Sequence, residues 1–155
     1  MGPRMKPIVN LGIFVADAAF RAARMPRMGE TILGQGFALG PGGKGSNQSV
    51  ASAMAGGRAH FITRLGDDDF ARMAQGIWAR AGVIPEVTTD PESFTGAAMI
   101  FLEAATGNNA IIVTPGAADR IPPADVDARK DLIASAAVFI TQLEHPIPAA
   151  QRGLE

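Results

Sequence analysis

The stretch GPGGKGSNQS, residues 40–49, has four glycines among its first six residues and leads into Gly45–Ala55, a segment that reads as a helix. Glycines allow a ligand to approach the backbone closely, and the bare N–H groups and dipole of a helix start point at whatever docks there. The stretch therefore predicts a site for an oxygen-rich ligand. The residues on either side indicate which fold presents it.

Around this stretch, short apolar runs alternate with segments of helical periodicity. The expected strands are Ile8–Val15, Ala59–Leu65 and Ala137–Thr141, and the expected helices are Gly45–Ala55, Asp69–Ala81 and Ala124–Ala136. Strands that alternate with helices indicate an α/β fold with a mainly parallel sheet flanked by helices.

Capping and turn residues support the ends of these helices. Asp67 or Asp68 can cap the start of the second helix, and Gly82 can end it. Pro123 suits the first turn of the third helix, and the glycine pair at 56–57 supplies a positive-φ stop for the first.

Two regions interrupt the alternation and predict a second, small β-sheet. One is Thr31–Leu39; the other is a hairpin formed by Thr95–Leu102 and Ala110–Thr114 around a turn at 107–109. A side sheet built from distant segments is well placed to act as a lid over a pocket at the sheet edge.

Composition excludes several classes of function. The chain has 155 residues, enough for one domain, and its net charge of −1 argues against nucleic acid or anionic membranes as partners. It has no cysteine, and its two histidines, His60 and His145, lie far apart, which makes a poor metal site. No apolar run reaches the roughly 18 residues of a membrane span, so a cytoplasmic protein is expected.

Three interpretations of the glycine-rich stretch compete. The stretch does not match a Walker A phosphate loop, because Ala38 stands where the first glycine belongs and Gly45 replaces the Ser or Thr after Lys44. A dinucleotide-binding fingerprint matches Gly40, Gly42 and Gly45, with Asp67 about twenty residues further on. The third interpretation accounts for more residues, since the spacing from GGKGSNQS (42–49) to Gly56 and Gly66 also matches a known signature.

That signature, with others along the chain, resembles the ribokinase, or PfkB, family of carbohydrate kinases, and most of all its ribokinase branch. The further motifs that carry the resemblance are Gly12 with Ala16-Asp17, PRMGET at 26–31, Gly66-Asp67-Asp68, Thr95-Gly96, Pro115-Gly116-Ala117 and Gln142-Leu143-Glu144. Their order and spacing cover nearly the whole chain. The resemblance implies a ribokinase-like fold whose lid comprises segments of about 17–40 and 93–114.

By resemblance, the complete protein transfers a phosphoryl group from ATP to a sugar hydroxyl, with D-ribose converted to ribose 5-phosphate as the expected reaction. Mg²⁺ and K⁺ are implied as cofactors with ATP, and a homodimer through the lid sheet as an assembly. The types of residue suit sugar hydroxyls, which need both acceptors and donors. The residues carried over as sugar contacts are Asp17, Gly42, Gly43, Lys44, Asn47 and Glu144, with Ala98 and Ile100 as apolar lid contacts.

The chain also departs from the family. Val15 stands where ribokinase-like sequences carry Asn, two residues before Asp17, which removes a polar contact and leaves the identity of the sugar open. The family's catalytic base lies in a Gly-Ala-Gly-Asp motif of the C-terminal half, together with the nucleotide and cation sites, and residues 1–155 contain no such motif. We therefore expect an N-terminal fragment of the fold that binds sugar weakly and is inactive alone, with no catalytic or metal-binding residue assigned.

Two alternatives remain at this stage. The first is a non-catalytic sugar- or nucleotide-binding module that kept the glycine-rich stretch. The second is an NAD-type domain, which would depend on Asp67 and not on Asp17 or Glu144. The acidic run 67–69 is expected to stabilise a helix start and not to bind a metal.

Overall fold

The computed structural model describes residues 5–155, which form two four-stranded sheets. The main sheet has the order β5-β4-β1-β8 and all of its strands are parallel; its strands are β1 (Ile8–Leu11), β4 (Ala59–Leu65), β5 (Ile84–Thr89) and β8 (Val138–Thr141). The small sheet has the order β3-β2-β6-β7, comprising β2 (Val15–Ala22), β3 (Gly36–Gly42), β6 (Thr95–Glu103) and β7 (Asn109–Gly116). The predicted α/β class with a second small sheet is confirmed.

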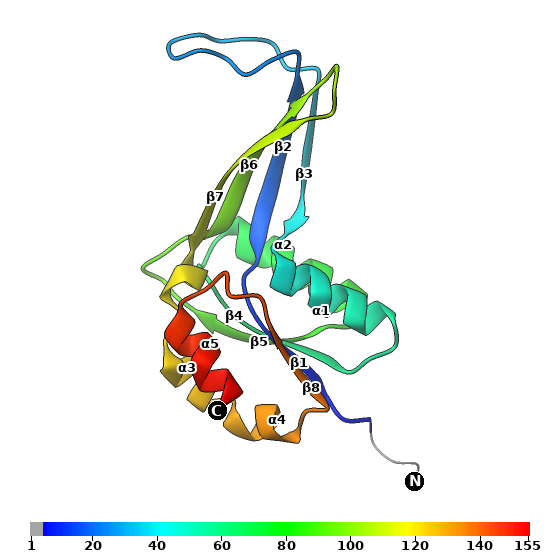
Figure 1. Cartoon of the computed structure of the whole chain (residues 1–155), viewed down its shortest axis with the longest axis vertical. Helices are drawn as coiled ribbons and strands as arrows, with labels where there is room; N and C mark the ends of the chain where they lie inside the picture. Colours follow the sequence, from blue (N-terminus) through cyan, green and yellow to red (C-terminus); the bar gives the residue numbers. More distant parts are fainter. Residues whose placement is uncertain (1–4) are drawn as a thin grey trace.

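Helices cover both faces of the main sheet. On one face, α1 (Lys44–Met54) and α2 (Asp69–Ala81) pack over a core cluster that contains Phe14, Phe61 and Trp78. Shorter helices cover the other face over a second cluster: η1 (Ala117–Arg120), α3 (Pro123–Asp127), α4 (Lys130–Ser135) and α5 (Ile147–Leu154). The small sheet extends away from this layered body (Figure 1). No helix among residues 5–155 is long and apolar enough to cross a membrane.

The apolar run Ile8–Val15, predicted as one strand, is divided between the two sheets. β1 ends at Leu11, and β2 begins at Val15 in the small sheet. The link between them lies against the start of α1, where the Ser46 N–H donates to the Ile13 carbonyl at 3.3 Å. This bond directs the Ile13 carbonyl toward α1, and the backbone leaves the parallel sheet between Leu11 and Val15.

Two other predicted boundaries were wrong. The segment predicted at Thr31–Leu39 forms a strand only from Gly36, where pairing with β2 begins. The helix expected over Ala124–Ala136 is two short helices, because the Arg129 guanidinium donates to the Asp125 carbonyl and to Thr88 and so interrupts the helical bonding. The sequence interpretation missed β5 altogether.

The predicted ends of α2 are confirmed. Asp68 is the N-cap, and its carboxylate accepts the Ala71 N–H at 2.9 Å. Gly82 ends the helix at φ 80°. Between these ends, the fully buried Trp78 donates its indole N–H to the Ser46 hydroxyl at 2.9 Å, which ties α2 to α1. The capping residues Asp68 and Gly82 thus explain where α2 begins and ends without tertiary information.

The Asp68 carboxylate should make the stability of the fold depend on acidity. Burial raises its pKa, but N–H bonds from Thr95 and Ala71 outweigh burial and hold the pKa of Asp68 below its ordinary value. A lowered pKa gives stability that is present above the unfolded-state pKa and is lost as the pH falls through the folded-state pKa. The free energy of unfolding should therefore fall on acidification below about pH 4.

Urea denaturation followed by the fluorescence of Trp78 measures this effect. Asp68→Asn should flatten the acid limb and, at neutral pH, cost about 1 kcal/mol, because an amide nitrogen in place of Oδ2 cannot accept the Thr95 N–H. Asp69→Asn is the matched control, because the Asp69 side chain is 92% exposed and pairs only with Arg72 on the surface. An acid limb that is as steep in Asp68→Asn as in the unchanged chain would refute the assignment.

Candidate functional site

The glycine-rich stretch joins the last residues of β3 to the start of α1, and two of its glycines allow close approaches. A Cβ on Gly42 would lie 2.3 Å from both carboxylate oxygens of Asp17. Gly43 has φ +88°, and a Cβ there would lie 2.4 Å from the Ile13 carbonyl oxygen. Glycine at these positions lets α1 begin directly against the β1–β2 link and beneath Asp17.

An open cavity of about 300 Å³ lies beyond the carboxyl ends of β1 and β8, between the start of α1 and one face of the small sheet. Open α/β sheets place their ligand sites at this edge. Charged and polar side chains form one part of the wall and apolar side chains the other. The lining residues are Ile13, Val15, Asp17, Gly43, Lys44, Asn47, Ala98, Ile100, Ile111, Val113 and Glu144.

Seven of the eight residues predicted as sugar contacts therefore line a single cavity: Asp17, Gly43, Lys44, Asn47, Ala98, Ile100 and Glu144. The eighth, Gly42, lies behind the Asp17 carboxylate and makes room for it. These residues come from β2, α1, β6 and the loop after β8, so the tertiary fold brings together positions up to 127 residues apart in the sequence. Their roles toward a ligand are taken up as a proposal below.

Asp17 is the anionic group on the small-sheet side of the cavity. Burial raises the pKa of its carboxyl above the ordinary value. The carboxylate form is therefore less well solvated here than in water, which favours a ligand that donates hydrogen bonds to it. A carboxylate in this position can accept from two neighbouring hydroxyl groups.

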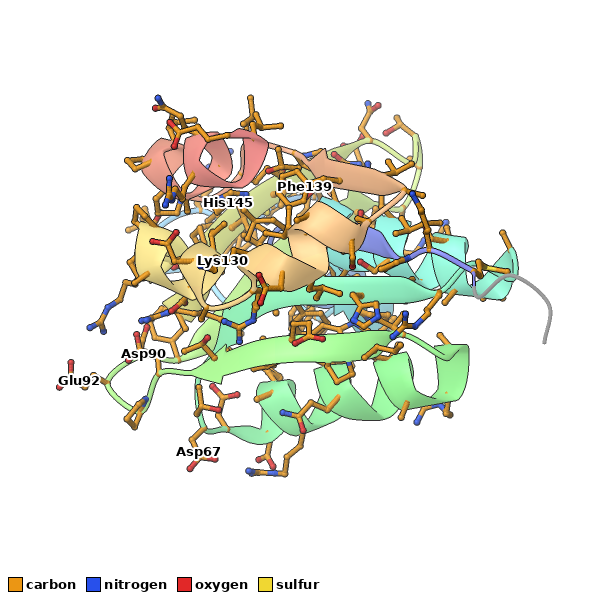
Figure 2. All side chains as sticks on the ribbon, turned by 90° about the horizontal axis from the view of Figure 1, so that it is seen from below. Asp67, Asp90, Glu92, Lys130, Phe139 and His145 are labelled. Carbon is orange, nitrogen blue, oxygen red and sulfur yellow. The ribbon has the colours of Figure 1, made fainter. Side chains whose placement is uncertain are left out.

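Lys44 and Glu144 form an ion pair across the cavity, joining the first turn of α1 to the loop that follows β8. Leu143 holds this loop in the left-handed region at φ 58°, which is uncommon for a residue other than glycine. His145, buried within the body, anchors the loop by a 2.8 Å contact between its Nε2 and the Thr141 hydroxyl (Figure 2). Burial lowers the pKa of His145, which favours the neutral ring.

The sequence interpretation missed two apolar lining residues on β7, Ile111 and Val113. Both follow from the register of the predicted hairpin, since Ala98 pairs with Val113 and Ile100 pairs with Ile111 across β6 and β7. Paired residues of adjacent strands share one face of a sheet. The sequence of the hairpin therefore contained the information that places Ile111 and Val113 at the cavity, but using it required knowing how the two strands pair.

The dinucleotide-binding interpretation does not fit this geometry. That fingerprint needs a strand of a parallel βαβ unit directly before the glycines. Here the preceding strand is β3, which pairs antiparallel with β2 in the small sheet. Asp67 is exposed at the rim of the body beside α2 and does not line the cavity (Figure 2).

Within residues 5–155, no three His, Cys, Asp or Glu side chains gather as a metal-ligand set. The acidic run 67–69 has the structural role expected of it, because Asp68 caps α2 and Asp69 pairs with Arg72. We derive no step through Mg²⁺ or K⁺.

The fold and its cavity can now be set beside the protein family whose sequence pattern this chain matches. Residues 5–147 match the pfkB family of carbohydrate kinases. The chain belongs to this family.

The curated relatives that match include ribokinases and deoxyribokinases. The chain is 36% identical over 155 residues to the ribokinase of Schizosaccharomyces pombe, and 29% identical over 152 residues to the deoxyribokinase of Salmonella typhi. In each case the match covers 96% of this chain and 48% of the relative. The chain thus spans about half the length of these curated relatives.

A solved structure shows the same likeness. The Arabidopsis thaliana ribokinase complexed with ribose and ATP superposes with a TM-score of 0.82 at 27% identity. The match covers 97% of this chain and 50% of that one. The arrangement of both sheets is therefore that of a ribokinase-like fold.

Proposed function

We propose that this chain forms the sugar-binding part of an ATP-dependent kinase that phosphorylates a pentose, with D-ribose to ribose 5-phosphate as the first reaction to test. The observation that carries the proposal is the single cavity lined by Asp17, Lys44, Asn47 and Glu144. The family match and the names of the relatives support the same activity. Since the chain spans about half of those relatives, the activity of the whole protein is part of the proposal.

The chemistry of the cavity suits a neutral polyol. The carboxylates of Asp17 and Glu144 accept hydrogen bonds from hydroxyl groups, and Lys44 and Asn47 donate to hydroxyl oxygens. Because the Lys44–Glu144 pair is already neutral as a unit, hydroxyls can bind there without an added counter-charge. Ala98, Ile100 and the apolar β7 residues can pack against ring carbons.

In this proposal the chain's own residues bind and orient the sugar. The start of α1 has no side-chain cap, and apart from the Ser46 N–H, which donates to Ile13, the N–H groups of its first turn can donate to a ligand. The small sheet acts as a lid that limits the access of water, which strengthens each polar contact beneath it. When bound, ATP supplies the transferred phosphoryl group, and no residue described here is assigned to ATP.

The small sheet also supports the proposed homodimer. Its register places one set of side chains toward the cavity and the alternate set on the opposite face. That opposite face is rich in exposed apolar residues: Phe20, Phe37, Leu39 and Ile112. A second copy of the chain would cover them, and the mass in solution measured by light scattering tests this arrangement.

Binding of D-ribose to the purified chain, measured by titration calorimetry, tests the proposed function. Asp17→Asn and Glu144→Gln should each weaken binding roughly ten-fold or more, because a carboxylate that accepts from hydroxyls is lost. Asp17→Asn should not lower the free energy of unfolding at neutral pH, since burial of this carboxylate disfavours its charged form.

Asp131→Asn, an exposed position on α4, is the matched control and should bind as the unchanged chain does. If no pentose binds, or if the two site variants bind as well as the control, the cavity is not a sugar site. Binding without phosphoryl transfer in the native-length protein would favour the non-catalytic module over the kinase.

A further inference from the structure

The loop after β8 brings Glu144 to the cavity, so the contacts that hold this loop determine where the Glu144 carboxylate lies. The loop follows Thr141, the last residue of β8, and ends at Pro146, directly before α5. Within it, Leu143 adopts φ 58° and is 58% exposed, so its own side chain contributes little to holding the loop. A residue with a Cβ is strained in the left-handed region. Contacts elsewhere in the loop must therefore maintain this conformation.

His145 supplies buried contacts at both ends of the loop. It is only 5% exposed. Its Nε2 lies 2.8 Å from the Thr141 hydroxyl at the end of β8, and its Nδ1 lies 3.3 Å from the Pro146 carbonyl oxygen at the start of α5. The backbone of Leu11, at the end of β1, also bonds to the ring. One imidazole therefore joins β1, β8 and α5 at the residue that follows Glu144.

The partners of the ring determine which nitrogen carries the proton. A carbonyl oxygen can only accept a hydrogen bond, so Nδ1 donates to Pro146. In the neutral ring Nε2 then keeps its lone pair and accepts from the Thr141 hydroxyl. The neutral form of His145 thus satisfies both nitrogens.

Protonation of His145 would disturb this arrangement in two ways. Nε2 would gain an N–H and could no longer accept, so the Thr141 hydroxyl would have to turn its proton toward another acceptor. The ring would also carry a positive charge in a buried position, and burial already lowers the pKa of His145. Both effects favour a loop conformation in which the charged imidazole reaches water.

The charged groups on the elements around His145 are already paired and do not compensate for this charge. Neither β1 nor β8 carries a titratable side chain. The acids on α3, on α5 and in the loop each have a basic partner. These pairs are Asp127 and Glu155 with Arg152, Asp125 with Arg64, and Glu144 with Lys44.

We propose that His145 is a positioning residue for Glu144 and that it makes sugar binding depend on pH. The neutral ring holds the loop with Glu144 at the cavity, whereas protonation releases the loop and withdraws Glu144 from the sugar. A group that is neutral in the held loop favours that loop above the ordinary histidine pKa of about 6.5 and loses this effect as the pH falls. The inference rests on the proposed function and adds a form of regulation of the same site.

Few other side chains titrate in the same range. The chain has two histidines and no cysteine, and carboxyl groups ordinarily titrate near pH 4. The second histidine, His60, lies on β4, contacts Glu86 at 2.9 Å and does not line the cavity. Since His60 is also 5% exposed, His60→Gln is the matched control, because it removes an equally buried imidazole away from the site.

Calorimetric titration of the full chain with D-ribose at about pH 7.5 and about pH 5.5 tests the inference, and binding should be roughly three-fold or more weaker at the lower pH. His145→Asn keeps a side chain that can donate and accept but does not titrate, so its affinity should be nearly equal at the two pH values. His60→Gln should keep the pH dependence of the unchanged chain. Any contribution from Asp17 is present in all three chains and cancels in the comparison.

A second measurement needs no variant. Binding and protonation are reciprocally linked, so saturation with D-ribose should lower the pKa of His145 measured from its ring signals by NMR, with the His60 signals as an internal reference. If His145 only packed in the core, His145→Asn would change the affinity by the same factor at both pH values and the sugar would not shift the titration.

The possible outcomes separate the inference from the function on which it rests. Equal affinities of the unchanged chain at the two pH values, or a pH dependence that persists in His145→Asn, would overturn the inference and leave the proposed function standing. Absence of D-ribose binding at both pH values would refute the proposed function itself. If His145→Asn does not fold, an unchanged titration of His145 on saturation with D-ribose still overturns the inference.

Discussion

Replacing Gly42 with alanine should abolish measurable sugar binding while the chain still folds. The new Cβ would lie 2.3 Å from both Asp17 carboxylate oxygens, so the carboxylate must turn away. The clash involves the end of a side chain and not the backbone, and Gly42 does not have positive φ. The fold can therefore adapt, but the main acceptor on the small-sheet side is displaced from the cavity.

Calorimetric titration with D-ribose measures this effect, and we expect a loss of affinity on the order of a hundred-fold, as for the removal of a buried polar partner. Gly40→Ala is a close control, because it lies on the same strand and an added Cβ meets nothing within 4 Å. Equal affinities for the two variants would show that Asp17 does not need its observed position.

Replacing Gly43 with alanine should cause the largest loss of stability among the glycine substitutions near the site. Two costs combine at this residue. Its φ of +88° disfavours any residue with a Cβ, and the added atom would lie 2.4 Å from the Ile13 carbonyl oxygen and 2.9 Å from the Phe14 Cα. These contacts are backbone atoms that cannot rotate away, so α1 must shift from the β1–β2 link.

Gly56→Ala separates the two costs. Gly56 has the same φ of +88°, but an added Cβ there meets nothing within 4 Å. Urea denaturation should therefore show a loss of about 1–2 kcal/mol for Gly56→Ala from backbone conformation alone. For Gly43→Ala we expect at least about 3 kcal/mol, because overpacking adds to the conformational cost. Similar losses in the two variants would mean that the close approach to Ile13 is not needed for stability.

These two substitutions separate binding from folding within adjacent residues. Gly42 makes room for the Asp17 side chain, which lines the cavity, whereas Gly43 makes room for the backbone that supports α1. The glycine-rich stretch therefore has two requirements that a motif pattern cannot distinguish, since both positions appear simply as glycine. Only the neighbours of each missing Cβ show which property depends on which residue.

Much of the fold was predictable from local chemistry. The ends of α2 follow from Asp68 and Gly82, and the end of α1 from the positive-φ Gly56. The hairpin of β6 and β7 follows from two apolar runs around a glycine turn. In each case the interactions that decide the conformation lie within a few residues of one another, where capping and turn rules apply.

The errors came from contacts between distant residues. The run Ile8–Val15 reads as one strand by hydropathy, but α1 takes the Ile13 carbonyl and divides the run between two sheets. The segment Ala124–Ala136 has helical periodicity, but it is interrupted at Arg129, whose guanidinium bonds to the hydroxyl of Thr88 on β5. Neither partner could be identified from periodicity, because the competing bonds form only when the strands are assembled.

For the site, the sequence alone was sufficient to name seven of the residues that line the cavity and to show a resemblance to a sugar kinase family. It did not determine the surroundings of each one. The tertiary structure decided that Lys44 pairs with Glu144 across the cavity, that Gly42 makes room for Asp17, and that His145 holds the loop that carries Glu144. The physical reason is that a side chain's partners, and therefore its charge state and its selectivity, depend on atoms that only long-range packing brings within bonding distance.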